Sequence, residues 1–324
     1  MKPKRVLPYY HPTSVCLIDD NASYLDSLSL HIPDDWPFKT FHSPFDALDY
    51  LNNPQRPRAL AQRCFTAQGG QFGVDLSQLE LEVSRTDRFE DVALAVVDYA
   101  MPSMNGLEMC ANLIDDNLRI VLLTGVADEA LAVEAFNAGL IHRFIRKAVI
   151  EEWGSLFAEI SQMRTDYFYK SCASLIAGLE SMPGHFTHNP NFADYFDSLC
   201  AELNIAEYYL VTNPAGYLMI TREGKAYRLV AATPSDLEQQ VRLCDQFNAP
   251  EKYRQGLVSG QLLAYFFDDA ADMTFEKIDW PDHFAESQAV PGGLPLKVAI
   301  FSNPPLDIDF DQTSSTLQAF MQKV

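Results

Sequence analysis

Four strand-like segments of this 324-residue sequence are each followed by a side chain that can do chemistry. SVCLI precedes Asp19 and Asp20, LAVV precedes Asp98, RIVLL precedes Thr124, and HRFIR precedes Lys147. A carboxylate at the end of a buried run is costly unless its charge is used there, because burial penalises an unpartnered charge. Asp98 is therefore either an ordinary strand-end residue in a loop or a reactive group held at the mouth of a sheet.

Segments with helical spacing alternate with these runs. Helices are expected at 21–32, 44–53, 106–116 and 128–139, with a further strand at 38–43. Five alternations predict an α/β fold, a five-stranded parallel doubly wound sheet with helices on both faces. In such folds ligands bind at the carboxyl ends of the strands, where the strand order switches. One strand-end acid alone would be read as a surface or capping group, but here all five side chains should meet at one edge.

Four segments carry a resemblance to a known family. LIDDN, VVDYAMPSMNG, VLLTG and FIRK occur in the order found in receiver domains of two-component response regulators. Residues 13–160 thus resemble a chemotaxis-type receiver domain. The resemblance implies a phosphoprotein of a phosphorelay, which takes its phosphoryl group from a sensor histidine kinase, a phosphotransfer protein or a small phosphodonor.

The resemblance also implies roles for individual residues. Asp98 is the implied phosphoacceptor, and the cofactor is Mg²⁺, which prefers oxygen ligands and keeps several waters. The implied magnesium ligands are Asp19, Asp20, Asp98 and the backbone carbonyl of Ala100, with Asp19 acting through water. The metal neutralises charge that would otherwise oppose attack of a carboxylate on a phosphoryl group.

Three further residues complete the implied site. Thr124 donates its hydroxyl to a phosphoryl oxygen, and Lys147 pairs first with the acceptor carboxylate and then with the phosphoryl group. Phe144, three residues before Lys147, occupies the position of an aromatic switch residue. Phe144 is read equally well as a core strand residue, and it lacks the hydroxyl of a tyrosine.

The sequence departs from the family in three places. Lys147 is followed by Ala148, where proline is common, and a cis peptide there would cost roughly 3 kcal/mol, so the loop is expected to be looser or strained. Ala100 and Val126 offer no side chain to orient a water, which predicts slow self-dephosphorylation. An insertion at about 54–91 is unusually long. We interpret it as a contact surface for the second domain in preference to a mere surface excursion.

A long helix is expected over 149–182. Its apolar positions are Val149, Trp153, Leu156, Ile160, Met163, Tyr167, Leu175 and Leu179. The first part closes the receiver domain, and the rest is predicted to connect it to the next domain. A seam of this kind packs on another domain or on its twin in a homodimer, and we favour the dimer.

Residues 185–324 predict a separate α+β domain with an antiparallel sheet. Helices are expected at 191–205 and 235–247, three strands within 208–233, and further strands at 261–267 and 296–302. The segment LVTNPAGYLMI faintly resembles the first hairpin of PAS-type sensory domains. We predict that this domain is an output module that binds a protein or a small ligand.

Charge bears on the function of the output domain. The chain has 24 Lys and Arg against 44 Asp and Glu, a formal charge of −20, and from residue 166 onward acids outnumber bases 21 to 10. A DNA-binding domain normally presents a basic face, so DNA is a less favoured partner. Two alternatives stay open, a DNA-binding transcription regulator and an enzyme whose site is unrecognised. Apart from its own phosphoryl transfer and dephosphorylation, the chain is not expected to catalyse a reaction.

Composition also predicts a cytoplasmic location. The six cysteines form no CxxC pair, which suggests reduced thiols. Residues 1–12, expected to be an N-terminal tail, have no apolar core of a secretory signal. No apolar stretch approaches the ~18 residues that a membrane helix needs, so no membrane partner is expected.

Overall fold

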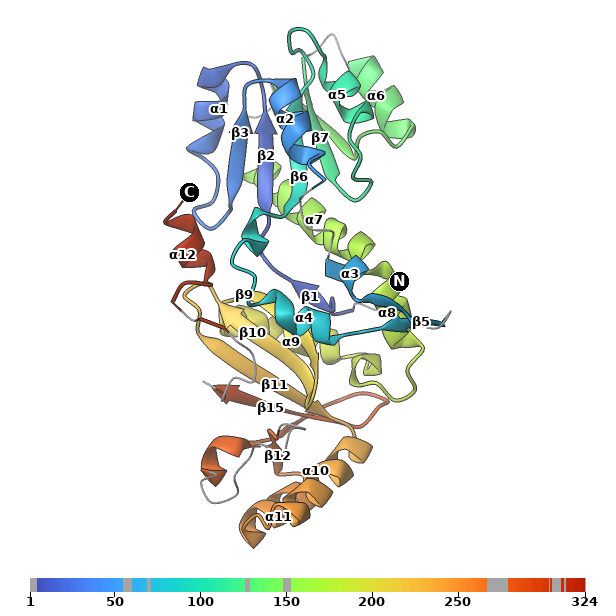
Figure 1. Ribbon diagram of the computed structural model, residues 1–324, viewed down its shortest axis with the longest axis vertical. Coiled ribbons are helices and arrows are strands. Elements are labelled where there is room, and N and C mark those ends of the chain that lie inside the picture. The colour runs from blue at the N-terminus through green and yellow to red at the C-terminus, as the bar shows by residue number, and fades with distance from the viewer. Residues whose placement is uncertain are drawn as a thin grey trace. The chain divides into compact units, whose positions relative to one another are not determined.

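The computed structural model describes residues 5–54, 60–68, 71–125, 129–147, 153–266, 279–302, 304, 310–311 and 313–323. The chain forms two compact units, shown in Figure 1. The parallel-sheet unit consists of Pro12–Ala59 and Asp87–Ser171. The antiparallel-sheet unit consists of Met1–His11, Leu60–Thr86 and Cys172–Lys323.

The parallel-sheet unit contains a five-stranded sheet of order β3-β2-β6-β7-β8, with every neighbouring pair parallel. Its strands are β2 (Ser14–Ile18), β3 (Phe38–Phe41), β6 (Val92–Asp98), β7 (Arg119–Thr124) and β8 (Arg143–Arg146). Its helices are α1 (Ala22–Ser29), α2 (Pro44–Leu51), α5 (Gly106–Ala111), α6 (Glu129–Asn137) and α7 (Trp153–Ser171), with a 3-10 turn, η1 (Arg88–Glu90). The predicted doubly wound α/β fold is confirmed. The strand order switches between β2 and β6, which places both acidic strand ends at the switch point.

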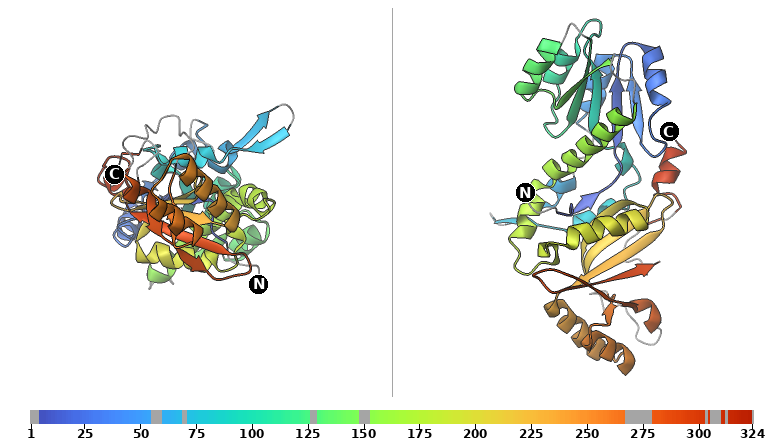
Figure 2. Two further views of the ribbon diagram at one scale, coloured as in Figure 1. Left: turned by 90° about the horizontal axis from the view of Figure 1, so that it is seen from below. Right: turned by 180° about the vertical axis from the view of Figure 1, so that it is seen from behind.

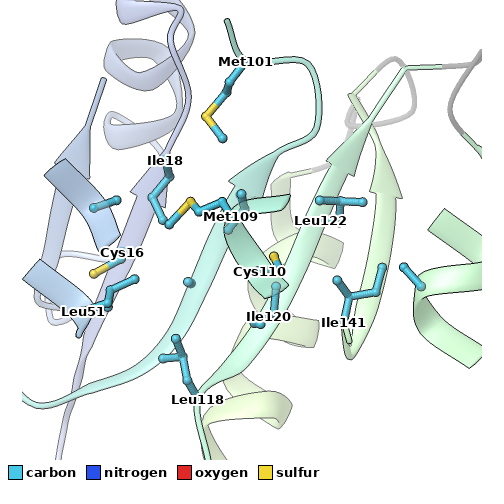
Figure 3. Packing of buried hydrophobic residues seen from close by; sticks show 14 of the residues in the cluster. Cys16, Ile18, Leu51, Met101, Met109, Cys110, Leu118, Ile120, Leu122 and Ile141 are labelled. Atoms are coloured by element: carbon cyan, nitrogen blue, oxygen red, sulfur yellow. The ribbon is translucent and has the colours of Figure 1, made fainter. Parts of the chain in front are cut away.

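Apolar residues cover both faces of this sheet. On one face Ala95 and Val97 of β6 pack in a cluster with α2, α5 and α6, and Figure 3 shows part of this cluster. On the other face Leu94 and Val96 pack with α1 and α7. Burial on both faces explains why β6 reads as a continuous apolar run instead of an alternating one.

The antiparallel-sheet unit is built on a six-stranded sheet of order β1-β9-β10-β11-β15-β14. Its strands are β1 (Tyr9–Tyr10), β9 (Ile205–Thr212), β10 (Ala215–Thr221), β11 (Ala226–Ala232), β14 (Gln288–Val290) and β15 (Leu296–Ser302). The smaller strands are β4 (Phe65–Gln68), β5 (Gln71–Val74), β12 (Leu262–Ala264) and β13 (Phe284–Glu286). Every neighbouring pair of strands in this sheet is antiparallel, which confirms the predicted antiparallel sheet of the second domain.

Helices and turns complete the antiparallel-sheet unit, and Figure 2 shows α10 beside α11. The α-helices are α3 (Leu60–Arg63), α4 (Ser77–Glu82), α8 (Ala173–Glu180), α9 (Phe192–Glu202), α10 (Pro234–Gln246), α11 (Glu251–Val258) and α12 (Leu317–Met321). The 3-10 turns are η4 (Phe186–His188) and η6 (Trp280–His283). Within the described ranges, no helix has the length and apolarity needed to cross a membrane.

The segment expected to be an N-terminal tail contributes a strand. Tyr9 and Tyr10 of β1 pair with Tyr209 and Tyr208 of β9, and Tyr9 is almost completely buried. Tyrosine fits a half-buried pleated surface well, which gives this short segment a place at the sheet edge. The expectation of a tail over 1–12 is wrong for these residues.

The insertion also folds with the antiparallel-sheet unit. Residues 60–86 hold α3, β4, β5 and α4, and they share their compact unit with the C-terminal half of the chain. Glu80 of α4 accepts a hydrogen bond from the backbone N–H of Thr212 at 3.2 Å. The structure therefore favours the interpretation of the insertion as a contact surface for the second domain over that of a mere surface excursion.

The predicted helix over 149–182 differs from the structure in its ends and in its seam. The first helix, α7, extends to Ser171, beyond the expected receiver boundary at 160, and α8 begins at Ala173. Leu156, Ile160 and Met163 pack in the core beside β2, β6 and β7. The chain itself buries the described part of the seam, so the seam gives no support for the expected homodimer. Val149 lies outside the described residues.

Candidate functional site

The structure brings the strand-end side chains to one edge of the parallel sheet. Asp19 and Asp20 follow β2, Asp98 ends β6, and Lys147 follows β8. Carboxylate oxygens of the three acids lie within 4.8 Å of one another. Asp19 and Asp98 are buried, whereas Asp20 is exposed. The carboxylates therefore form a single group that is open to solvent on the side of Asp20.

Lys147 binds two of these acids at once. Its Nζ lies 2.6 Å from Oδ2 of Asp19 and 2.8 Å from Oδ1 of Asp98. Burial alone would lower the pKa of Lys147, but the hydrogen bonds with Asp19 and Asp98 outweigh it and raise that pKa. The ammonium is therefore charged at neutral pH and attached to both carboxylates.

Opposing effects act on the pKa of Asp98. Burial and the nearby charge of Asp19 raise the pKa of Asp98, although the hydrogen bonds from Lys147 and from the backbone N–H of Ala100 act in the opposite direction. Three carboxylates and one ammonium leave two net negative charges when all four groups are ionised. Such an excess favours a bound cation.

The donor set fits magnesium. Mg²⁺ takes hard oxygen ligands from one or two carboxylates together with waters, and Asp19, Asp20 and Asp98 supply carboxylates from two neighbouring strands. Asp19 is oriented by the backbone N–H of Asn21, which donates to its Oδ1 at 2.9 Å. The role of the Ala100 carbonyl as a ligand stays a prediction.

A close approach of α5 to β6 fixes the backbone at Asp98. Asn105 caps α5 and forms a capping box with Glu108. The N–H of Gly106 donates to the carbonyl of Tyr99 at 3.0 Å. A Cβ on Gly106 would lie 2.3 Å from the carbonyl oxygen of Asp98. Only glycine allows this contact, which our sequence reasoning missed although the Asn-Gly pair is a local indication of it.

Thr124 stands at the end of β7, where it was expected. It is fully buried, and its Oγ1 has no hydrogen-bond partner among the residues that the structure describes. A buried hydroxyl without a partner is costly and is therefore available to a ligand oxygen that reaches it. This observation agrees with a phosphoryl-binding role without testing it.

Tyr24 is a neighbour of the site that the sequence analysis did not identify. The Nζ of Lys147 lies 4.6 Å from the centroid of the Tyr24 ring. Tyr24 belongs to the first turn of α1, directly after the acids of β2. Its proximity to Asp20 in sequence is the one indication that the sequence offers.

Phe144 lies in β8 and is half-buried. It packs at the margin of the core cluster, with its ring 6.5 Å from that of Phe136 in an edge-on arrangement. Its proposed movement as a switch stays a prediction. Ala148 and Val126 lie outside the described residues, so the expectations for the peptide after Lys147 and for dephosphorylation stay predictions as well.

Comparison with known proteins identifies the class of the first unit. Residues 57–153 match the family described as response regulator receiver domain. The matched range includes Asp98, Thr124 and Lys147, and Asp19 and Asp20 precede it. With its five-stranded parallel sheet, the chain thus contains a response regulator receiver domain. The family match does not extend to residues 172–323.

A solved structure shows similarity beyond the receiver. The response regulator LqsR of Legionella pneumophila is 25% identical, with a TM-score of 0.76, over 98% of this chain and 96% of that one. An adenylate cyclase from Rhodopirellula baltica is 22% identical (TM-score 0.36) over 52% of this chain and 98% of its own. A receiver domain protein from Clostridium thermocellum is 15% identical (TM-score 0.33) over 49% and 95%, respectively. No curated protein matches the sequence.

Proposed function

We propose that this chain is a phosphorylation-dependent response regulator and that Asp98 is its phosphoacceptor. The observation that carries the proposal is the contact of one ammonium, that of Lys147, with two buried carboxylates at the switch point of the sheet. The receiver-family match over 57–153 and the similarity to LqsR support the same function.

The proposed reaction transfers a phosphoryl group to Asp98. A carboxylate oxygen of Asp98 attacks the phosphorus of a phosphohistidine on a kinase or phosphotransfer protein, or of a small acyl phosphate. The new O–P bond forms as the P–N or P–O bond of the donor breaks, and the bonding electrons leave with the donor. Lys147 then keeps its contact with Asp19 and pairs with the phosphoryl oxygens, to which Thr124 donates its hydroxyl.

Magnesium would be held by Asp19, Asp20 and Asp98 together with the carbonyl of Ala100. When bound, it supplies positive charge that offsets the repulsion between the attacking carboxylate and the phosphoryl group. The buried positions of Asp19 and Asp98 strengthen this electrostatic effect relative to water. Phe144 is the proposed switch residue that responds to the movement of Thr124.

For the output unit we propose binding of a protein or a small ligand. The acidic balance of residues 166–324, 21 acids against 10 bases, opposes a DNA duplex. Arg228, one of the cations near the β10–β11 turn, is buried and donates to the backbone carbonyls of Asn213 and Pro214. Arg228 therefore stabilises the turn between β9 and β10 and adds nothing to a basic surface.

The phosphoacceptor is tested with radiolabelled acetyl phosphate and Mg²⁺ on the full chain. Wild type should become labelled, Asp98→Asn should not, and Asp49→Asn is a control because Asp49 is an exposed acid on α2 of the same unit. Labelling of Asp98→Asn at the wild-type level would refute the assignment.

The output proposal is tested on the full chain with and without beryllofluoride. A partner capture runs beside a selection from genomic DNA at moderate salt. A stoichiometric protein or small-molecule partner supports the proposed class. Salt-sensitive recovery of a discrete DNA sequence would replace it with a transcription regulator.

A further inference from the structure

Lys147 has a third neighbour besides its two carboxylates, the aromatic ring of Tyr24. Its Nζ lies 4.6 Å from the ring centroid, which is within the range of a cation–π interaction. The backbone N–H of Tyr24 donates to the side chain of Asn21 at 3.1 Å. Asn21 caps α1, so the capped first turn of this helix sets the position of the ring.

We propose that Tyr24 is a positioning residue of the phosphoryl site, whose ring holds the Lys147 ammonium toward Asp19 and Asp98. This inference rests on the proposed function and deepens it. A lysine side chain has four rotatable bonds and a compact, mobile charge, so its position must be fixed by its surroundings. The two carboxylates accept from the ammonium, and the ring face attracts it from a further direction.

A ring suits this position better than another acid would. An additional carboxylate beside Lys147 would attract the ammonium but would also repel an incoming phosphoryl group. The face of an aromatic ring attracts the cation without a net charge. It also leaves the N–H groups of the ammonium to the oxygens of the carboxylates and of the phosphoryl group.

The hydroxyl of Tyr24 is separable from this role. It is buried and has no hydrogen-bond partner within the described part of the chain. Burial raises the pKa of Tyr24, so the phenol stays neutral at physiological pH. An unpaired buried hydroxyl destabilises a fold, and phenylalanine should therefore replace Tyr24 without loss.

The test compares Tyr24→Phe with Tyr24→Leu in the full chain, using beryllofluoride with Mg²⁺ as the probe. We expect Tyr24→Phe to bind within about twofold of wild type, with an equal or higher Tm. Tyr24→Leu should bind about 5- to 30-fold more weakly, from the range of a partly desolvated cation–π contact. Tyr50→Leu is the matched control, because the ring of Tyr50 lies 4.8 Å from Nζ of Lys39 in the same unit. Its affinity should not change.

The possible outcomes separate a role of the Tyr24 ring from a role of its hydroxyl and from a loss of folding. Equal losses of beryllofluoride affinity in Tyr24→Phe and Tyr24→Leu would assign the role to the hydroxyl and overturn the inference. Wild-type affinity in Tyr24→Leu would overturn it as well, because neither the ring nor the hydroxyl would then matter for binding. If Tyr24→Leu does not fold, Tyr24→Met replaces it, and the side-chain ¹⁵N resonance of Lys147 reports whether the ammonium has moved. An unmoved resonance also overturns the inference. Absence of binding by wild type would instead refute the proposed function itself.

Discussion

Replacement of Gly106 by alanine tests whether the backbone contact between α5 and β6 holds the phosphoacceptor. The added Cβ would lie 2.3 Å from the carbonyl oxygen of Asp98 and 3.0 Å from Cδ1 of Leu122. The first neighbour is backbone, which cannot move aside as a flexible side chain does. Either the start of α5 or the end of β6 must therefore shift, and Asp98 shifts with the latter.

The magnitude follows from two opposing effects. Overpacking of a well-packed site costs about 1–3 kcal/mol, and the better helix propensity of alanine returns at most about 1 kcal/mol. A net loss of roughly 1–2 kcal/mol corresponds to a fall in Tm of about 4–8 °C for a unit of this size. Weaker binding of beryllofluoride should accompany the loss, because the acceptor carboxylate moves.

Gly154→Ala is the matched control for thermal unfolding of the same unit. Gly154 lies in α7, is exposed, and has open space around the position of an added Cβ. Alanine there should raise stability by up to about 1 kcal/mol. If Gly106→Ala matched wild type in Tm and in beryllofluoride affinity while Gly154→Ala gained stability, the close approach at Asp98 would be refuted.

Two further predictions concern a histidine and the insertion. Burial, then the charges of Arg119 and Lys170, lower the pKa of His142 to about 4, against an opposing effect of Asp166. Below about pH 6.5 this imidazole is therefore protonated in the unfolded chain but stays neutral in the native protein. The free energy of unfolding consequently falls as the pH drops from 6.5 toward 4. Because His142 is partly exposed, solvent screening reduces the effect to about 1 kcal/mol. His142→Asn should therefore reduce the difference in the free energy of unfolding between pH 7.5 and pH 5, measured by urea titration, by about this amount. An unchanged difference would contradict the assignment. Glu80→Ala should lower the stability of the antiparallel-sheet unit by about 1 kcal/mol, because it removes the oxygen that accepts from the N–H of Thr212. Glu238→Ala, at an exposed position of α10, should not lower it, and equal effects of the two changes would argue against the contact.

The parallel sheet and its site were predictable because their indications are local. The central strands β2, β6 and β7 are buried on both faces and therefore appear as nearly continuous apolar runs. The carboxyl ends of parallel strands share one edge, so the sequence alone could place Asp19, Asp98 and Lys147 together. Their actual contacts agree with this placement.

The remaining features depend on partners that are distant in sequence. Tyr9 and Tyr10 form too short a segment to show a strand period, and their pairing with Tyr208 and Tyr209 spans about two hundred residues. An apolar seam on a helix likewise shows that something covers it without showing what. In this chain Leu156 and Ile160 pack on the parallel sheet instead of on a second copy.

The chain passes between its two units four times, after His11, Ala59, Thr86 and Ser171. Strand β9 of the antiparallel-sheet unit illustrates the consequence of these crossings. The N–H of Leu210 donates to the carbonyl of Pro8 at 2.7 Å, and that of Thr212 donates to Glu80, so β9 depends on segments that precede most of the receiver in sequence.

A fragment that begins at residue 185 would lose both of these partners and α8, and would expose the edge of β9. The antiparallel-sheet unit is therefore built from three separate segments of the chain instead of from C-terminal residues alone. For the same reason four covalent connections join the two units, and the helical segment expected to be the connector supplies only one of them.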